Sequence, residues 1–375
     1  MIGSGTVGEV LAHASPRHPV AVWVNLCAVT ERRGCAVACP DKFRGTLTAG
    51  EAAAAIASGL RRAGYEDVRE IPMADGGEGS LDALHEARGG SRRVTTVTGP
   101  LGDPVEAEWL VLPDGTAIIE MARASGRALA TRRSDPLGAT TRGTGELLVA
   151  ARAGGARRAV VCVGGSATTD GGLGAVEALG WNLRGLEVTV ACDVSTVFTD
   201  AARLFGPQKG ASPAQVDLLT RRLASLVETY RRHGGVDVTS LEGAGAAGGL
   251  AGGLAALGAR LEPGFEVIAR VTGLDHALEE ADLVVTGEGR LDATSFLGKV
   301  AGGVLEWSVE EGVLHRAVIA GQVTDDARDE CAVFPDTQVL ALTERVWTPA
   351  ETFVRTGLLV EEAAVEAGRH ALGRS

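Results

Sequence analysis

The sequence has few aromatic residues, no closely spaced cysteine pair and no excess of positive charge. Aromatic residues make up 4% of the 375 residues. None of the six cysteines forms a Cys-x-x-Cys pair, and the seven histidines lack the spacing of zinc ligands, which argues against a disulfide scaffold and a zinc site. The formal net charge is −12. An acidic chain without a basic stripe is unsuited to bind nucleic acid or an anionic membrane.

No apolar run reaches the roughly 18 residues that a membrane-spanning helix needs. Residues 20–29 are apolar, but no small-residue cleavage site follows them, so we expect a cytoplasmic protein rather than an exported one. Residues 3–8 (GSGTVG) formally match the dinucleotide motif Gly-x-Gly-x-x-Gly, yet only Met1 and Ile2 precede them where a strand is required. An oxidoreductase would rest on this motif alone. We interpret residues 1–33 as a flexible N-terminal extension.

Glycine, by contrast, is abundant, with 52 residues. The glycines cluster without a three-residue period, which excludes a collagen-like chain and indicates turns where backbone approaches a ligand closely. From residue 35 onward, short β-branched runs alternate with segments of helical period, which predicts an α/β fold. Continuous apolar runs predict strands of a parallel sheet that is buried on both faces: 35–39, 68–72, 159–163, 188–192, 283–286, 317–320 and 338–341.

Residues 93–125 have a different pattern. Three short runs, 94–97, 105–111 and 116–121, are joined by turn signals rich in Gly, Pro and Asp. This arrangement predicts antiparallel strands and favours a second domain of different architecture, inserted after the first strand–helix–strand unit. Residues 243–258 consist almost wholly of Gly, Ala and Leu, and we interpret them as a glycine-rich turn that leads into a tightly packed helix.

Polar, glycine-rich segments follow several predicted strands, and in open α/β sheets ligands bind at the carboxyl ends of strands. The first such segment carries Lys42 and Arg44. It ends in Thr48 and Glu51, a capping box that begins a helix over residues 49–63. Two cations beside a helix N-terminus suit an anion, either a carboxylate or a phosphate, although an ordinary solvated loop would have the same pattern.

Two further segments have different chemistry. Asp75 and Glu78 stand among three glycines, where they could hold Mg²⁺ through water, hold substrate hydroxyls, or serve only the following helix. Residues 164–172 (GGSATTDGG) follow another strand, and their backbone N–H groups and hydroxyls could form a phosphate cradle or simply a tight turn. They do not match the Walker-type motif, which excludes a P-loop of that kind.

The last two segments are richer in charge. Asp193 follows the predicted buried strand 188–192, where an unpaired carboxylate costs free energy because it loses hydration. We therefore expect Asp193 either to bind a ligand or a paired group or to cap a helix. Lys209 lies between glycines a little further on and could neutralise phosphate charge. Residues 286–292 (TGEGRLD) carry Glu288, Arg290 and Asp292 on what we expect to be a glycine-flanked loop. This loop either binds a ligand or is a surface loop whose charged side chains pair with one another.

The inventory of these segments is carboxylates, cations and backbone cradles, without a Cys–His or Ser–His pair. Such a set suits phosphoryl transfer, in which positioning and charge neutralisation dominate and Mg²⁺ accompanies the phosphates. It does not suit acyl transfer.

The same segments resemble the bacterial type I glycerate kinases. The matching blocks keep their order from about residue 34 to residue 345 and onward: PDKFRGTLT (40–48), PMADGGEGS (72–80), GPLGDP (99–104), EMARASG (120–126), GTGEL (143–147), GGSATTDGG (164–172), ACDV (191–194), GPQKGA (206–211), GAGAAGGLAG (243–252) and TGEGRLD (286–292).

The resemblance implies an α/β fold of two different domains with the active site in the cleft between them. A discontinuous flavodoxin- or Rossmann-like domain with a parallel sheet would comprise residues 34–92 and 262–375. A mixed α/β domain would be inserted at residues 93–261. The implied reaction transfers the γ-phosphate of ATP to a hydroxyl of D-glycerate, in a monomer or a homodimer.

On this basis we assign roles as hypotheses. Asp193 is the first candidate for the catalytic base and Asp75 the second. Glycerate would be bound by Lys42, Arg44, Asp75 and Glu78, and the two cations among them could also take the transferring phosphate. The nucleotide would be bound by Gly164, Gly165, Ser166, Thr168, Lys209 and Arg290. Mg²⁺ would be held, mostly through water, by Asp170, Glu288 and Asp292.

The chain departs from the family between residues 181 and 186, where members usually carry a longer segment of a few tens of residues. Residues 291–299 (LDATSFLGK) also differ from the more frequent pattern of the family, which has a Gln-Thr or Gln-Ser pair before the Gly-Lys. Two alternatives follow: a kinase for another small hydroxy acid, or a kinase-like protein that the shortened segment leaves inactive.

Overall fold

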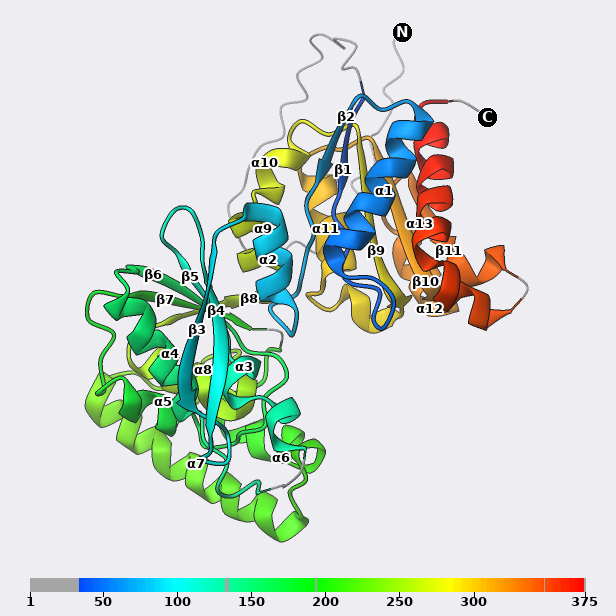
Figure 1. The fold of residues 1–375 in the computed structure, drawn as a ribbon. Coiled ribbons are helices and arrows are strands. Elements are labelled where there is room, and N and C mark those ends of the chain that lie inside the picture. Colours follow the sequence, from blue (N-terminus) through cyan, green and yellow to red (C-terminus); the bar gives the residue numbers. More distant parts are fainter. Residues whose placement is uncertain (1–33, 132–134, 193, 347, 374–375) are drawn as a thin grey trace, which may run out of the picture. The chain divides into compact units, whose positions relative to one another are not determined.

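The computed structural model describes residues 34–131, 135–192, 194–346 and 348–373. Their strands form two sheets (Figure 1). The motif at residues 3–8 lies outside the described residues. The first sheet has the order β11-β10-β9-β1-β2 and is parallel throughout. Its strands are β1 (Cys35–Ala38), β2 (Asp67–Glu70), β9 (Leu283–Leu291), β10 (His315–Val323) and β11 (Thr337–Ala341).

The second sheet is mixed, with the order β3-β4-β5-β6-β7-β8. Its first two pairings are antiparallel, as the turn signals predict, and the remaining three are parallel. The strands are β3 (Ser91–Thr98), β4 (Pro104–Val111), β5 (Ala117–Glu120), β6 (Arg158–Cys162), β7 (Glu187–Cys192) and β8 (Arg260–Pro263). The α/β fold class with a parallel sheet and a mixed sheet is thus confirmed.

Two strands differ from the sequence-based expectation. The short β8 is only half-buried, so it has no apolar run that could indicate it. β9 is longer than expected, because it continues through Gly287 and Gly289 and pairs with β10 as far as Leu291. Glu288 and Arg290 therefore lie in a strand and not on a loop. Because side chains alternate along a strand, these two residues are on the same face.

The domain boundaries stay a prediction. The first sheet draws its strands from the two ends of the chain and the second from its middle, in the order expected. However, β3 begins at Ser91 and β8 ends at Pro263, so each strand extends across a predicted boundary.

The helices cover both sheets. Longer helices are α1 (Ala49–Ala63), α2 (Ser80–Arg88), α4 (Arg142–Ala153), α7 (Pro213–Gly234), α8 (Ala246–Ala256), α9 (Gly264–Thr272), α11 (Val300–Glu310), α12 (Asp325–Ala332) and α13 (Pro349–Ala371). Short ones are α3 (Ala122–Ser125), α5 (Leu173–Ala178), α6 (Ala201–Phe205) and α10 (Leu274–Leu278), with 3-10 turns η1 (Arg127–Ala130), η2 (Phe198–Asp200), η3 (Pro207–Lys209), η4 (Ala293–Phe296) and η5 (Leu342–Arg345).

The helix α1 has the predicted bounds and the predicted capping box. The Thr48 hydroxyl accepts a hydrogen bond from the Glu51 N–H, and the Glu51 carboxylate accepts one from the Thr48 N–H. α1 packs against α13, and the contact is close because Gly59 carries no side chain: a Cβ there would lie 2.3 Å from the Glu361 carbonyl oxygen.

Glycine also permits the packing of α8, which follows the predicted glycine-rich turn and is buried along its whole length. Gly248 has a φ of +68°, and a Cβ on it would lie 2.0 Å from the Thr168 carbonyl oxygen. Any larger residue at this position would push α8 away from residues 168–172.

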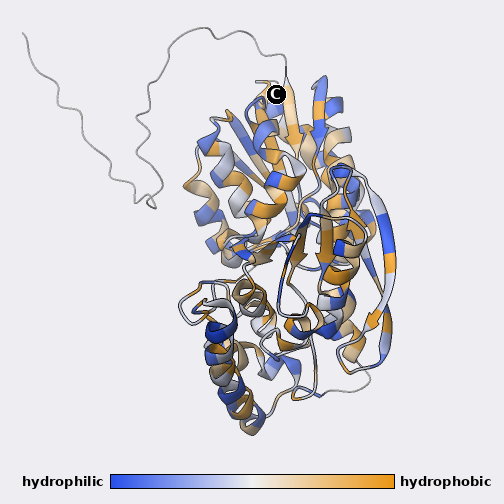
Figure 2. Cartoon of the chain, turned by 90° about the vertical axis from the view of Figure 1, so that its left-hand side faces the viewer, coloured by the Kyte–Doolittle hydropathy of each residue, from blue (hydrophilic) through white to orange (hydrophobic). Residues whose placement is uncertain are grey.

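One of the apolar clusters joins the two sheets. Leu81 and Leu84 of α2 and Phe265 of α9 pack in a single cluster with Met73 next to the first sheet and with Ile118 of the second. Figure 1 shows α2 and α9 lying between the sheets, and Figure 2 shows apolar segments among the strands and alternating apolar and polar residues along the helices. This shared core fixes the strand ends that carry the candidate site.

Candidate active site

Loops from both sheets meet at the carboxyl ends of their strands. The Lys42 Nζ, after β1, donates a hydrogen bond of 2.6 Å to the Glu78 carbonyl, after β2. Gly164, after β6, lies against the same segment, since a Cβ there would be 2.5 Å from the Gly77 Cα. Gly289 of β9 lies close to Arg44, because a Cβ on this glycine would be 3.1 Å from the Arg44 backbone nitrogen. The structure therefore brings four of the predicted segments together.

Asp41 also belongs to this site, although sequence reasoning passed over it in favour of Lys42 and Arg44. Its N–H donates to the Gly287 carbonyl at 2.8 Å, which holds it beside β9. Its Oδ1 accepts the Lys42 N–H at 2.7 Å and lies 3.7 Å from the Lys42 Nζ. Burial raises the pKa of Asp41, Lys42 opposes this effect, and Asp75 adds to it. The signal that could have revealed Asp41 is its position three residues after the end of the buried strand β1.

Glu288, in β9, lies near the Asp41 carboxylate. Burial raises the pKa of Glu288 to about 7, and the nearby Asp41 carboxylate contributes to the rise, whereas Ser295 and Lys299 counteract it. Its Oε1 is buried and has no hydrogen-bond partner among the described residues. A buried carboxylate oxygen without a partner indicates a position where a ligand, a proton or a metal ion completes the site.

Asp75 and Glu78 take different positions in their shared segment. Asp75 is half-buried, and its Oδ1 accepts the Gly77 N–H at 3.0 Å. The side chain of Glu78 is exposed while its carbonyl is held by Lys42. Arg44 is exposed as well. These side chains are accessible to a small substrate.

Asp292 has a structural role that the sequence did not suggest. Its Oδ1 accepts the Thr294 N–H at 2.9 Å and the Thr294 hydroxyl at 2.6 Å, so it caps η4. The hydroxyl of Thr294 lowers the pKa of Asp292. Its Oδ2 lies 3.6 Å from the Nε of Arg290, whose side chain is mostly exposed.

The segment 164–172 turns much of its polar surface inward. The Gly165 carbonyl accepts the Arg127 N–H at 2.9 Å, and the Ala167 N–H donates to the Ser125 carbonyl at 3.0 Å. Thr168 is fully buried, and its carbonyl accepts a 2.6 Å hydrogen bond from the Lys209 Nζ. Ser166 is also buried. The hydroxyl oxygen of Thr168 is buried and has no hydrogen-bond partner among the described residues, so Thr168 stays a candidate for ligand binding. Gly164 and Gly165 face residues 77 and 78.

Asp170 is the anchor of this segment. Its Oδ2 accepts hydrogen bonds from the Thr141 N–H and hydroxyl, both at 2.8 Å, and from the Gly174 N–H at 3.2 Å. Its Oδ1 accepts the Gly172 N–H at 3.1 Å. A carboxylate has about four lone-pair sites. Because the protein itself engages most of these sites, the geometry disfavours the predicted Mg²⁺ role and indicates a positioning role instead.

Asp193, the first candidate for the base, lies outside the described residues, so its role stays a prediction. The residues before it do reach the site. A Cβ on Gly76 would lie 3.0 Å from the Ala191 carbonyl oxygen, and one on Gly264 would lie 3.3 Å from that of Cys192. The carboxyl end of β7 is therefore next to the segment of Asp75.

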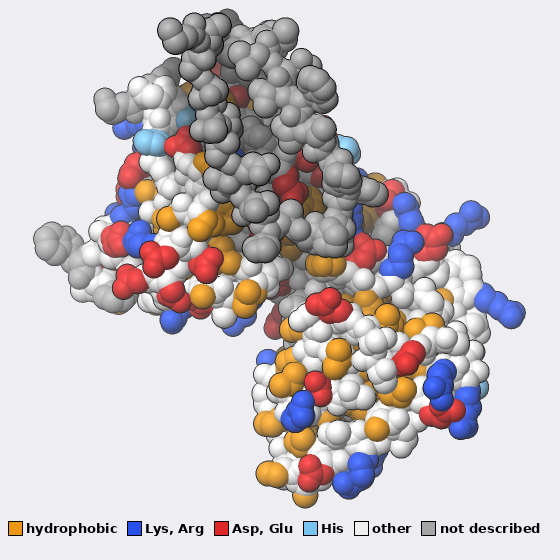
Figure 3. Space-filling view, turned by 180° about the vertical axis from the view of Figure 1, so that it is seen from behind, with side chains coloured by type: hydrophobic (Ala, Val, Ile, Leu, Met, Phe, Trp, Pro, Cys, Tyr) orange, Lys and Arg blue, Asp and Glu red, His pale blue; other side chains and the backbone are white. Residues whose placement is uncertain are grey.

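No group of three or more His, Cys, Asp or Glu side chains placed to hold a metal ion occurs within the part of the chain that the structure describes. None of the helices in that part is both long and apolar enough to span a membrane. Figure 3 shows positive and negative side chains interspersed on one face of the molecule rather than gathered by sign.

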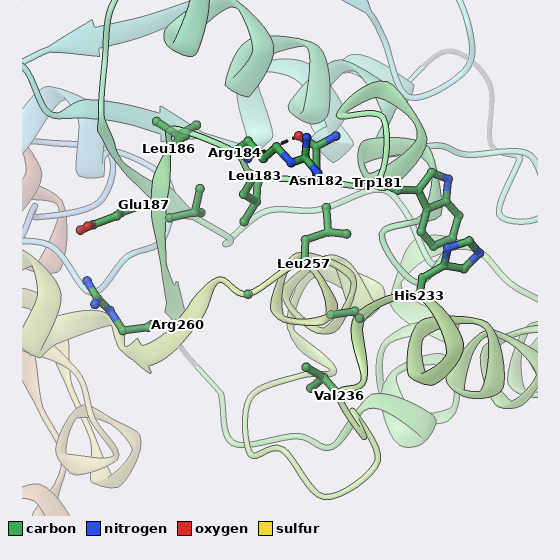
Figure 4. Close-up of a pocket in the computed structure, with 14 residues that line it drawn as sticks. Trp181, Asn182, Leu183, Arg184, Leu186, Glu187, His233, Val236, Leu257 and Arg260 are labelled. Carbon is green, nitrogen blue, oxygen red and sulfur yellow. Dashed lines mark hydrogen bonds between the residues drawn. The ribbon is translucent and has the colours of Figure 1, made fainter.

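Of the hollows lined by described residues, one lies near the candidate site and another lies away from it. One of about 260 Å³ lies beside segment 164–172 and is lined by Arg127, Ala167, Gln208 and Lys209, among others. The other, of about 470 Å³, is lined by Trp181, Arg184, His233 and Arg260 (Figure 4). In it the Trp181 and His233 rings stack with their centroids 4.2 Å apart. This second hollow adjoins the first residues of β7 and β8, at the edge of the sheet opposite the candidate site.

Comparison with known proteins identifies the family. The model of the glycerate kinase family matches residues 36–185 and 181–371. The chain belongs to the glycerate kinase family. The two matched stretches overlap at residues 181–185, within the short connection between residues 181 and 186.

Individual relatives agree with this membership. The chain is 40% identical over 330 residues to a glycerate 2-kinase of Escherichia coli K12, covering 77% of this chain and 86% of the relative. It is 37% identical over 367 residues to a glycerate kinase of Halalkalibacterium halodurans, covering 88% and 96%. A crystal structure of a glycerate kinase 2 from Salmonella typhimurium LT2 superposes with a TM-score of 0.78 at 33% identity, covering 91% and 98%.

Proposed function

We propose that this protein phosphorylates D-glycerate, with ATP as the phosphate donor and the 2-hydroxyl as the acceptor. The observation that carries the proposal is the meeting of Lys42, Asp41, Glu78 and Glu288 at the ends of adjacent parallel strands. Family membership supports the activity, and the E. coli relative named as a glycerate 2-kinase supports the choice of hydroxyl.

The cations bind and neutralise the anionic groups. Lys42 and Arg44 hold the carboxylate of glycerate, Arg44 through its planar fork of donors. Lys209 and Arg290 neutralise nucleotide phosphates, and the glycines 164 and 165 allow those phosphates to approach the backbone. Such fixed charges stabilise the charge that develops on the transferred group without reorganising during the step.

The carboxylates orient and deprotonate the acceptor. The oxygen of the glycerate hydroxyl forms the new bond to phosphorus as the bond to the leaving oxygen of ADP breaks, and the hydroxyl proton passes to a carboxylate. Asp193 is our first candidate for that base and Asp75 the second. Asp75 is half-buried and lies beside the end of β7, and Asp193 is the next residue of the sequence after that strand.

Mg²⁺ fits the donor set of the site. Glu288 offers a buried, unpartnered carboxylate oxygen, and oxygen is the ligand that Mg²⁺ prefers. Glu288 would hold the ion mainly through water, together with nucleotide phosphates, and Asp292 would contribute through its Oδ2. When bound, the ion neutralises phosphate charge.

A phosphorus NMR spectrum of the product made from D-glycerate and ATP tests the proposal. We expect the resonance of 2-phosphoglycerate together with ADP. A 3-phosphoglycerate resonance would contradict the regiochemistry alone. Release of ADP with a different hydroxy acid but not with glycerate would contradict the substrate, and glycerate binding by calorimetry without turnover would contradict the activity.

The short connection at residues 181–186 lies at the opposite end of β7 from the candidate site. It precedes Glu187, the first residue of β7, whereas the candidate site adjoins Cys192, its last residue. Five steps along a strand span about 17 Å. This separation supports a catalytically active protein despite the missing segment.

A further inference from the structure

Glu120 is a carboxylate in an unusually buried position. It ends β5, and its side chain is 1% exposed. An ionised carboxylate that is removed from water needs partners to offset the loss of hydration. Both of its oxygens have one. Oε1 accepts the Gly79 N–H at 2.6 Å, and Oε2 lies 3.4 Å from the Arg123 Nε.

The hydrogen bond from the Gly79 N–H to Glu120 lies at the N-terminal end of α2. Gly79 is the N-cap of this helix, with a φ of +97°, and as a glycine it has no side chain with which to cap it. Glu120, from the end of β5, accepts the N–H of this N-cap residue, the bond that the N3 carboxylate makes in a capping box. Its negative charge also stands at the positive end of the helix dipole, where it is favourable.

Gly79 directly follows the residues that we place around glycerate. In this segment Asp75 is held through the Gly77 N–H, and the Ser80 hydroxyl donates to the Gly77 carbonyl at 2.7 Å. Lys42 holds the Glu78 carbonyl from the side of β1. Glu120 holds the next residue from the side of β5. The segment is therefore fixed between two anchors that belong to different sheets.

We propose that Glu120 is a positioning residue of the phosphotransfer site: by binding the Gly79 N–H it fixes the segment that carries Asp75 and Glu78. The proposal rests on the proposed function for the substrate that this segment binds. Glu120 itself is buried, and its effect on the substrate is exerted through this segment.

The chain offers a matched control. Arg123 pairs with Glu120, and it also lies 3.1 Å from Asp82 of α2 and 3.5 Å from Glu108 of β4. Glu108 pairs in addition with Arg92 at 3.1 Å. The Glu108→Ala variant thus removes a carboxylate from the same ion network, but it leaves the bond to Gly79 in place.

Steady-state kinetics with both substrates test the proposal. In Glu120→Ala we expect the KM for glycerate to rise about tenfold, the loss of one charge-assisted hydrogen bond, and the KM for ATP to stay within about twofold. Glu120→Gln retains an oxygen that accepts the Gly79 N–H, so it should recover most of the glycerate affinity. Glu108→Ala should leave both KM values unchanged.

Hydrogen exchange gives a readout that does not depend on activity. The Gly79 amide should exchange about tenfold faster in Glu120→Ala than in the wild type and at the wild-type rate in Glu108→Ala. If Glu120→Ala does not fold, Glu120→Asp, whose shorter side chain cannot reach Gly79, should show the same changes.

Two results would overturn the proposal: equal effects on both KM values, matched by Glu108→Ala, or unchanged Gly79 exchange in the Glu120 variants. A wild-type protein without turnover on glycerate would instead contradict the proposed function, and the exchange experiment would still decide the role of Glu120.

Discussion

The loops at the carboxyl ends of the two sheets use their polar groups differently. After β1 and in β9 of the parallel sheet, Arg44 and Arg290 are exposed and Glu288 has an unpartnered oxygen. After β6 of the mixed sheet, Asp170 accepts hydrogen bonds from its own surroundings and Thr168 is fully buried. Similar glycine-rich sequences thus place their charged side chains differently: those of the first sheet are open to a ligand, whereas Asp170 of the second holds the fold.

The largest effect is expected at Lys42, the cation of the open loops. Lys42→Ala should lower kcat/KM by about 10³-fold, because it removes both a fixed charge at the reacting groups and the bond to the Glu78 carbonyl. The melting temperature should change little, since the side chain is partly exposed. An ADP-release assay beside a thermal melt measures both. A loss of activity that merely follows a loss of folded protein would assign Lys42 to the scaffold instead.

Asp193→Asn comes next and asks whether the mixed sheet also contributes chemistry. If Asp193 is the base, kcat should fall by at least about 100-fold while the protein stays folded. Asp75→Asn is the comparison variant. A near-normal kcat in Asp193→Asn together with a large loss of kcat in Asp75→Asn would identify Asp75, which follows a strand of the parallel sheet, as the base. The difference between the two sheets would then be larger.

Asp170→Ala should act on stability rather than on chemistry. It leaves the Thr141 hydroxyl and the N–H groups of Thr141, Gly172 and Gly174 without their acceptor, and we expect a loss of about 3 kcal/mol in the free energy of unfolding. Urea denaturation measures it. Below the unfolding transition, kcat per folded molecule should remain within about threefold. Loss of Mg²⁺ dependence in this variant would instead favour the original assignment as a metal ligand.

The smallest effect concerns the pH dependence of stability at Glu120. Burial raises the pKa of Glu120 above its ordinary value of 4.5, against the opposing effects of Gly79 and Arg123. The unfolded chain then releases its proton at a lower pH than the folded chain, so this group lowers stability as the pH rises above about 4.5.

Glu120→Gln does not titrate. The free energy of unfolding of this variant relative to the wild type should therefore increase between pH 4 and pH 7, as followed by urea denaturation at several pH values. A relative stability that falls over this range would mean that the partners of Glu120 outweigh its burial.

Several elements could be predicted because their signals are local. The capping box of Thr48 and Glu51 specifies where α1 begins, and the turn residues between 98 and 117 specify two antiparallel pairings. The apolar runs locate the strands whose ends carry Lys42 and Asp75. Motif order over the whole chain was sufficient to identify the family.

Other features depend on contacts between distant residues. The glycines 287 and 289 suggested a loop, but backbone pairing with β10 keeps Glu288 and Arg290 in a strand. The backbone groups and the carboxylate of segment 164–172 suggested a ligand cradle, but Ser125 and Arg127 bind two of the backbone groups and Thr141 binds the Asp170 carboxylate. Sequence shows which groups can bind, and packing decides what they bind.

By itself, then, the sequence determined where strands end, which residue types follow them and the family to which they belong, because helix caps, turns and apolar periodicity act over a few neighbouring residues. Only the tertiary structure decided that Asp41 and Glu288 lie close together, that Asp170 accepts hydrogen bonds from its own surroundings and that Glu120 binds the Gly79 N–H. Each of these depends on the burial of a charged group against partners many residues away, and burial exists only once the sheets have packed on their common core.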